Sequence, residues 1–438
     1  MLKIRFRIIG LTRPAINRFA AYTLCIRIGL LLTSFQIVLP LLSLAAVFDV
    51  ENEHQMKTAL DIAGTNKEAD IINILADMTP AESLKYIPEN YPLTINGNGF
   101  SISGSGKYRC LDIKDKKLPL SNAHISIYNL TFSNGSDLAA AGLLINYRSP
   151  NNTSNINVAG CTFRENKAKL WEIGWGGGAY IISYNGNISI RDCTFIKNSS
   201  AAGAGGVKVE ASGFGNISII GCSFISNTAA IWYGGALVHA AGGGRMEFNG
   251  NMVANNASYR RSAGGVGIWV GLGQPAGGHA TVNNNLIYEN ESPEVSGMYV
   301  WARGGSEIDI INNTIASNPA GTGLFLRSEG QDDSIKVFNN IVWHHAYEII
   351  KYSASEGHIS GGFNSYGEGK SELTSESDVH KSPDFIGDKD FHLKAGSPCI
   401  DAGFIGSIVP VSDIEGHQRP QGRGVDIGAY EFTPLNRK

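Results

Sequence analysis

The chain has 438 residues, of which 53 are glycine, and only 17% of its residues are charged. This composition is typical of all-β and solenoid proteins, which contain many tight turns and much buried backbone. The formal net charge is −3 at pH 7, and lysine and arginine form no cluster after the N-terminal segment. The sequence therefore argues against nucleic acid and anionic membranes as partners.

Residues 1–45 have the composition of a secretory signal peptide. The segment contains no acidic residue, and its basic residues are Lys3, Arg5, Arg7, Arg13, Arg18 and Arg27. An apolar run from Ile28 to Val47 follows, and residues 43–45 (Ser-Leu-Ala) form a small-x-small cleavage site. We therefore expect export, to the medium or the cell surface, without membrane attachment once the signal is removed. An uncleaved anchor is the alternative, because about 20 apolar residues can span a bilayer.

Residues 46–120 are expected to form an N-terminal cap followed by irregular first rungs. Asn52 and Gln55 have the spacing of a helix capping box, and Gly64 stands where the helix would end. The residues between them with helical apolar spacing are Met56, Ala59, Leu60 and Ala63. One amphipathic helix of this kind would cover the apolar end that a solenoid otherwise exposes.

Residues 121–365 contain eight copies of one pattern, three of which read CTFREN, CTFIKN and CSFISN. The slot of the first residue is filled by Leu130, Cys161, Cys193, Cys222, Asn251, Asn285, Asn313 and Asn340. Apolar pairs stand five and three residues before the slot, and Phe, Val or Ile stands two residues after it. This alternation predicts short strands, and the period of about 30 residues predicts a solenoid.

A residue that tolerates positive φ precedes each slot, namely Asn129, Gly160, Asp192, Gly221, Gly250, Asn284, Asn312 and Asn339. A second corner is expected five residues after the slot, at Asn166, Asn198, Asn227, Asn256, Asn290 and Asn318. A Gly-led strand such as GGVKVEA follows each second corner. Three short strands in each rung predict an all-β fold, the right-handed parallel β-helix.

Five cysteines follow the signal segment: Cys110, Cys161, Cys193, Cys222 and Cys399. Five cysteines are few for a chain of this length, and their number is odd, which is unusual for an exported protein held together by disulfides. Stacked rungs would place Cys161, Cys193 and Cys222 in one interior column, about 4.8 Å apart, where they fill space as small apolar residues. We expect packing, with a zinc site or a disulfide as the alternative.

Residues 366–438 are expected to form an irregular C-terminal cap. It contains GSPCIDAG (396–403) and VDIGAYE (425–431), with Asp413, Gly416, Arg419 and Pro420 between them. These residues closely resemble the C-terminal module of choice-of-anchor Q proteins, which are exported bacterial β-helix proteins. The FREN, FIKN, FISN, GGAY and GGAL segments are similar to the FxxN and GGA repeats of chlamydial polymorphic membrane proteins. The resemblance implies a pectate-lyase-like β-helix at a bacterial surface.

The Gly-led strands are expected to point a strip of aromatic and polar residues outward. Its members include Tyr180, Glu210, Leu237, His239, Trp269, Tyr299, Trp301, Phe325 and Arg327. Aromatic rings in successive rungs suit stacking on sugars, so Tyr180, Trp269, Tyr299, Trp301 and Phe325 are the candidate ligand-binding residues. A loop that covers the strip is the alternative.

The candidate catalytic residues are Glu210, His239 and Arg327. Glu210 and His239 fall in adjacent rungs of one column, as an acid/base pair would require. On another outward column Glu247 and Asp309 fall two rungs apart, about 10 Å, and we expect solvated surface there. The function expected is polysaccharide binding by a monomer; the alternatives are a polysaccharide lyase or glycoside hydrolase, or a purely structural surface protein.

Asp401, Asp413 and Asp426 are clustered with Arg419 and Glu431 in the C-terminal cap. We expect salt bridges there, and a Ca²⁺ site is the alternative. No other cofactor is expected.

Overall fold

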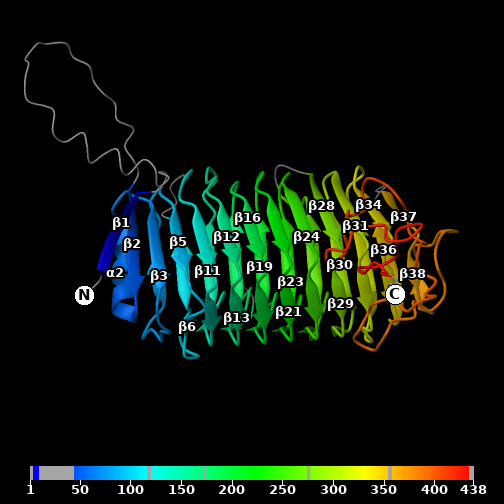
Figure 1. The fold of residues 1–438 in the computed structure, drawn as a ribbon, viewed down its shortest axis with the longest axis horizontal. Coiled ribbons are helices and arrows are strands. Elements are labelled where there is room, and N and C mark those ends of the chain that lie inside the picture. The colour runs from blue at the N-terminus through cyan, green and yellow to red at the C-terminus, as the bar shows by residue number, and fades with distance from the viewer. Residues whose placement is uncertain are drawn as a thin grey trace, which may run out of the picture.

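The computed structural model describes residues 3–8, 44–115, 120–171, 174–273, 277–353, 358–367 and 369–433. These residues form an elongated stack of strands, with the N-terminal part at one end and the C-terminal part at the other (Figure 1). One α-helix, α2 (Glu53–Ala63), occurs in the described ranges. The predicted all-β parallel β-helix is therefore confirmed. Most of the predicted signal peptide, residues 9–43, lies outside the described residues.

Three long sheets run the length of the stack, and a short fourth sheet accompanies its middle. Sheet A contains β1 (Lys3–Ile8), β2 (Leu44–Val50), β3 (Asp70–Ile74), β5 (Leu93–Asn96), β8 (Ile125–Tyr128), β12 (Ile156–Ala159) and β16 (Ile188–Arg191). It continues with β20 (Ile217–Ile220), β24 (Arg245–Asn249), β28 (Gly278–Asn283), β31 (Ser306–Ile311), β34 (Ser334–Phe338) and β37 (His358–Gly362). Apart from β1, which pairs antiparallel with β2, neighbouring strands are parallel.

Sheet B follows sheet A in each rung. It contains β6 (Ser101–Ser103), β9 (Thr131–Ser133), β13 (Thr162–Arg164), β17 (Thr194–Ile196) and β21 (Ser223–Ile225). It continues with β25 (Met252–Ala254), β29 (Leu286–Tyr288), β32 (Thr314–Ala316), β35 (Ile341–Trp343) and β38 (Ser365–Tyr366). The short sheet D contains β10 (Ser136–Asp137), β14 (Lys167–Ala168), β18 (Ser199–Ser200), β22 (Thr228–Ala229) and β26 (Ala257–Ser258).

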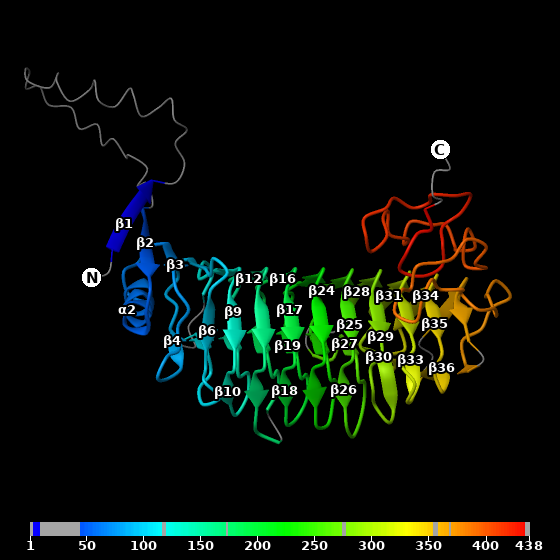
Figure 2. The ribbon, with the colours of Figure 1, turned by 60° about the horizontal axis from the view of Figure 1, so that its bottom comes forward.

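Sheet C closes each rung and contains the Gly-led strands. It contains β4 (Leu84–Tyr86), β7 (Leu111–Lys114), β11 (Leu143–Tyr147), β15 (Ala179–Ser183), β19 (Val207–Ala211) and β23 (Ala236–Ala240). It continues with β27 (Val266–Val270), β30 (Val295–Ala302), β33 (Thr322–Ser328), β36 (Tyr347–Ser353) and β39 (Lys370–Ser371). Figure 2 shows the sheets as successive walls of one stack.

The core is the space enclosed by the three long sheets, and the predicted repeat sets its contents. Equivalent residues pair across rungs, as in Phe163–Phe195–Phe224. Their rings stack with centroids 4.6 and 5.1 Å apart. The corner before each slot also follows the prediction, because all eight predicted corner residues have φ between 49° and 64°.

Two ladders of buried asparagines run along the corners. In the first, Asn251, Asn285, Asn313, Asn340 and Asn364 each donate an amide to a carbonyl oxygen of the rung before. In the second, Asn166, Asn198, Asn227, Asn256, Asn290 and Asn318 bond from one rung to the next. His345 ends the second ladder, with Nε2 3.0 Å from the Asn318 amide nitrogen. Each side chain satisfies backbone groups that the corners would otherwise bury unpaired.

The three cysteines continue the first ladder toward the N-terminus. The Cys161 backbone N–H donates to Cys193 Sγ at 3.4 Å, and the Cys222 backbone N–H donates to Asn251 Oδ1 at 2.9 Å. All five cysteines described are buried and free. The packing interpretation is therefore confirmed for this column, and the disulfide alternative is wrong.

Helix α2 covers the N-terminal end of the core. Asn52 Oδ1 accepts from the Gln55 N–H, so the predicted N-cap forms. The Gln55 side chain accepts from the Glu51 N–H, one residue before the cap, so the reciprocal bond of the predicted capping box reaches a different residue. The predicted apolar face is buried, and Gly64 is the C-cap. The pairing of β2 with β3 begins at Ala46 and Asp70, directly after the predicted cleavage site.

The C-terminal segment does more than close the far end of the stack. Figure 2 shows it, in orange to red, folded back beside the last rungs. Asn284, Asn312 and Asn339 donate from the corners of three rungs to its backbone carbonyls at Ser412, Asp426 and Phe404. Among the five earlier corner residues, Gly160, Asp192, Gly221 and Gly250 lack this amide, and only Asn129, in the first of the eight copies, has it. The three consecutive Asn corners thus coincide with the docking site.

The second ladder gives a stability prediction. Replacing Asn256 by Ala removes bonds to the Asn227 N–H and amide, the Phe224 carbonyl and the Asn290 amide oxygen. Because several buried groups lose their partner, we expect a loss of about 2–5 kcal/mol in unfolding free energy. Denaturant titration measures it. Asn255→Gly, at the exposed positive-φ residue beside it, is the control, and equal stability of both variants would contradict the ladder's role.

The docked corner gives a second prediction. Asn339→Gly keeps a residue that tolerates positive φ but removes both bonds to Phe404, at 2.9 and 2.6 Å. We expect faster amide exchange around Phe404, corresponding to about 1–3 kcal/mol of lost docking energy, with little change in the repeats. Asn129→Gly, at the same kind of corner but in an early rung, should leave that exchange unchanged. Unaltered exchange in Asn339→Gly would show that these bonds do not hold the segment.

Candidate binding face on sheet C

The outer face of sheet C carries two columns of side chains in strict register. The first column runs Asp112, Leu144, Tyr180, Lys208, Leu237, Gly267, Tyr299, Phe325 and Ile350. The second runs Lys114, Asn146, Ile182, Glu210, His239, Trp269, Trp301, Arg327 and Tyr352. The predicted outward strip therefore exists, and it is charged toward the N-terminus and aromatic toward the C-terminus.

In the aromatic half, Trp269 and Trp301 lie in adjacent rungs, as predicted, with ring centroids 5.3 Å apart. Their planes make an angle of 75°, so the two indoles do not form one flat surface. Both are half-buried. Trp269 Nε1 donates to the Tyr233 hydroxyl at 2.8 Å, whereas Trp301 Nε1 is buried and has no hydrogen-bond partner among the described residues.

Arg327 covers part of this half and is held in place. Its guanidinium lies 4.4 Å from the centre of the Trp301 ring and 5.6 Å from that of Tyr352. It forms an ion pair with Glu329 and donates to the Tyr299 hydroxyl at 3.3 Å. Tyr299 in turn stacks on Phe325 at 5.0 Å. These contacts make Arg327 a positioning residue for the rings, because each of its three side-chain nitrogens already donates a hydrogen bond.

The loops before the Gly-led strands add aromatic residues that our sequence analysis did not include. Trp175 and Trp232, two rungs apart, stack almost in parallel at 5.3 Å. Gly203 lies between them, and a Cβ there would come within 2.6 Å of the Trp175 ring, so only glycine lets the indoles meet. Tyr233 packs over Gly267 in the same way. Aromatic residues directly before a Gly-Gly pair were the available sequence signal.

The loop residues therefore cover part of the strip, as our alternative stated. Tyr233 is only 1% exposed and packs with Leu237, while Trp175, Trp232, Trp269, Tyr299 and Phe325 are partly exposed around it. Tyr180, expected on the open strip, is buried at 9% exposure. The accessible aromatic surface thus combines strand and loop residues.

In the charged half, Lys208 and Glu210 form the centre of a compact network. Lys208 Nζ is 3.1 Å from a Glu210 carboxylate oxygen and 4.6 and 4.8 Å from the ring centres of Trp175 and Tyr180. The Tyr180 hydroxyl lies 2.8 Å from Arg148 and 3.2 Å from Glu210. Glu210 is therefore surrounded by two cations and a hydroxyl.

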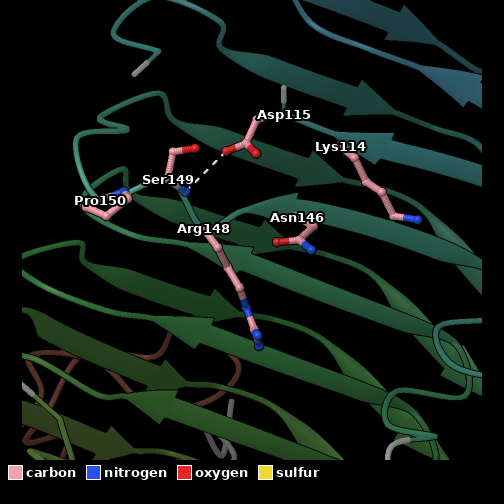
Figure 3. A pocket seen from close by; sticks show the side chains of 6 residues that line it. All are labelled: Lys114, Asp115, Asn146, Arg148, Ser149 and Pro150. Carbon is pink, nitrogen blue, oxygen red and sulfur yellow. Dashed lines mark hydrogen bonds between the residues drawn. The ribbon is translucent and has the colours of Figure 1, made fainter. Parts of the chain in front are cut away.

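An open cavity of about 420 Å³ adjoins this network toward the N-terminus. Figure 3 shows Lys114, Asn146 and Arg148 extending from neighbouring strands along its wall. Asp115 accepts from the Ser149 backbone N–H at 3.2 Å at its far side. The cavity offers both charges and an amide, which is the donor and acceptor mixture that polyhydroxylated ligands use.

Glu210 and His239 are cross-strand neighbours, as predicted. Burial by itself would raise the pKa of Glu210, but Lys208, His239 and Arg148 together hold it below its usual value. Burial lowers the pKa of His239 to about 4, against the opposing effect of Glu210. Near neutral pH the carboxylate is ionised and the imidazole is neutral, so neither group is protonated for acid catalysis, and both are weak bases because their pKa values lie well below 7.

The predicted cap carboxylates serve the backbone. Asp426 accepts from the Asp401 and Phe432 N–H groups, and Asp413 accepts from those of Glu415, His417 and Glu431. Asp401 accepts from Gly424. Their cluster also holds the predicted buried salt bridge, Arg419–Glu431 at 2.6 Å. No group of three or more metal-ligating side chains is arranged for a metal within the described ranges.

The stack of parallel strands places the chain in the class of parallel β-helix proteins. No family model matches the chain, and no curated protein matches it. Among solved structures, the crystal structure of pectate lyase Pel9A is similar, with 13% sequence identity and a TM-score of 0.42. The match covers 83% of this chain and 88% of the lyase. A likeness at this level says nothing about the ligand or reaction of the chain.

Among the described residues, no helix has the length and apolar character needed to cross a membrane.

The charge network gives a prediction on the pKa of Glu210. Lys208→Met removes the nearest cation and keeps the stem that packs on Trp175 and Tyr180. Because burial then acts with less opposition, we expect the Glu210 pKa to rise, measured by carbon-13 NMR. In the wild type the depressed pKa of Glu210 stabilises the fold at pH values above the pKa of the unfolded chain, which is about 4.3. This contribution is lost as the pH falls through the pKa of the folded protein. An unchanged pKa would show that Lys208 is not the cause.

Proposed function

We propose that the chain is an exported parallel β-helix protein that binds an extracellular or cell-envelope polysaccharide along the outer face of sheet C. The observation that carries this proposal is the band of partly exposed rings, Trp175, Trp232, Trp269, Tyr299 and Phe325, next to a charged, open cavity. Aromatic faces match the apolar C–H faces of sugars, and the charged half supplies hydrogen bonds to hydroxyls. A glycan lying along the stack axis would meet both halves.

Two further observations support the export and surface parts of the proposal. Cleavage after Ala45 would remove β1 with its antiparallel pairs to β2, but it would leave every pair between β2 and β3 intact, because that pairing starts at Ala46. The residues that resemble the choice-of-anchor Q module also form one connected network, in which Arg419, Asp413 and Asp426 satisfy Glu431 and nearby backbone groups. We propose that this segment is such a module, and that the protein acts as a monomer without a cofactor.

A polysaccharide lyase is the second candidate. The observation that favours it is the neutral His239 beside ionised Glu210, since β-elimination begins when a base removes a proton. A glycoside hydrolase is less favoured, because it needs a carboxylic acid that donates a proton, and Glu210 is held ionised. A purely structural surface protein is the remaining alternative.

The test is retention of the protein on a panel of immobilised polysaccharides, with assay of new reducing and unsaturated ends. We expect Trp269→Ala with Trp301→Ala to weaken retention by about 1–3 kcal/mol, because stacking area is lost. Tyr259→Ala, which removes a ring that is 66% exposed outside the two columns, is the control.

Glu210→Gln separates binding from catalysis. Retention that persists in this variant, without product in either protein, supports binding alone. Unsaturated product that disappears with Glu210→Gln identifies a lyase, and product with new reducing ends alone identifies a hydrolase. Undiminished retention in the double tryptophan variant, or a collapse of its melting temperature, would show that those rings serve only as structure.

A further inference from the structure

A second polar groove lies on the outer face of sheet A, away from the two columns of sheet C. Its side chains come from two columns in register, Arg245–His279–Glu307 and Glu247–Thr281–Asp309. A cavity of about 260 Å³ opens between β20, β24 and β28, lined by Ser218, Arg245, Glu247, His279 and Thr281. The sequence predicted solvated surface for Glu247 and Asp309, because spacing along the chain shows their own column but not its contacts with the neighbouring one.

His279 connects its own column with the column that contains both carboxylates. Its Nε2 lies 3.1 Å from Asp309 Oδ2, while Lys336 Nζ lies 3.8 Å from Asp309 Oδ1. Asp309 is only 7% exposed, so its carboxylate fixes the imidazole from the sheet side. If Nε2–H is the donor in that contact, Nδ1 remains for a ligand in the groove.

Asp309 holds His279 from outside the cavity, because Asp309 itself is not one of the residues that line it. Its Oδ2 contacts the imidazole, and its buried Oδ1 makes no hydrogen bond but is paired with Lys336. The groups that a ligand in the groove can reach are therefore those of Ser218, Arg245, Glu247, His279 and Thr281.

Glu247 is positioned from the opposite side of the groove. Arg191 Nη2 donates to Ser218 Oγ at 3.3 Å, and Ser218 Oγ donates to Glu247 Oε2 at 3.3 Å. This series of hydrogen bonds ends at Glu247. The contact between His279 and Asp309 starts from the next rung. The cavity occupies the interval between the two hydrogen-bonded groups.

The chemistry of the lining selects the ligand class. A phosphate would be repelled by Glu247, and a metal ion would be repelled by Arg245. A carboxylate, a guanidinium, an imidazole and a hydroxyl together match a neutral ligand whose groups both donate and accept. We infer that the groove on sheet A is a second saccharide site, which binds one sugar unit through its hydroxyls. The inference rests on the proposed function for the ligand class but not on the sheet C site.

The experiment measures retention of the full-length protein on the same polysaccharide panel and compares variants of the two faces. Glu247→Gln keeps the shape of the side chain but weakens its hydrogen bonds to hydroxyls, and His279→Ala removes the imidazole. We expect each to reduce affinity about 5–20-fold for at least one glycan that the wild type retains. Glu307→Gln, an exposed carboxylate on the same face outside the cavity, should leave retention unchanged.

The outcomes of this experiment distinguish the sheet A site from the sheet C site. Loss in Glu247→Gln and His279→Ala, added to the loss in the tryptophan variant, supports both sites. Retention that responds only to the tryptophan variant overturns the sheet A site and leaves the proposed function standing. Retention that responds only to the sheet A variants supports this inference and removes the sheet C proposal. If no glycan is retained, both are wrong, and melting temperatures within a degree of wild type exclude misfolding as the cause.

Discussion

The structure depends on how its two buried corners satisfy their backbone groups. Each rung turns sharply between sheets A and B and again after sheet B, which points peptide N–H and C=O groups into a space without water. The asparagine ladders bond those groups along the stack, with each amide reaching a carbonyl of the rung before it. A bond of this kind requires equivalent residues to lie directly above one another at the strand spacing of about 4.8 Å. The ladders therefore favour a single register over the length in which they occur.

Strict register in the core imposes strict register on the surface. Because side chains alternate in a strand, an interior fixed in this way leaves the outward positions in columns at the same spacing. The face of sheet C is one consequence, since Glu210, His239, Trp269 and Trp301 follow each other in adjacent rungs. The groove on sheet A arises from the same geometry. A regular scaffold of this kind can offer an extended ligand binding groups that are spaced at constant intervals.

Local departures from the repeat decide what remains accessible. Glycine at 203 and 267 lets Trp175, Trp232 and Tyr233 fold down onto the outer face of sheet C, where a larger side chain would hold them away. Asparagine at three late corners fixes the C-terminal segment against the side of the stack. The regular part of the chain thus provides register, and the irregular parts cover or expose particular stretches of it.

The sequence by itself determined the rungs, the positive-φ corners, the interior columns, the capping helix and the order of outward residues on sheet C. Each of these follows from period-two alternation and from a repeat with the same residue type at the same place, which are local properties. Tertiary structure decided the angle between Trp269 and Trp301, the burial of Tyr180 and the contact of His279 with Asp309. It also decided the docking of the C-terminal segment. These depend on loops of irregular sequence and on side chains from different columns that meet diagonally, and no spacing along the chain encodes such contacts because they are set only when the rungs pack.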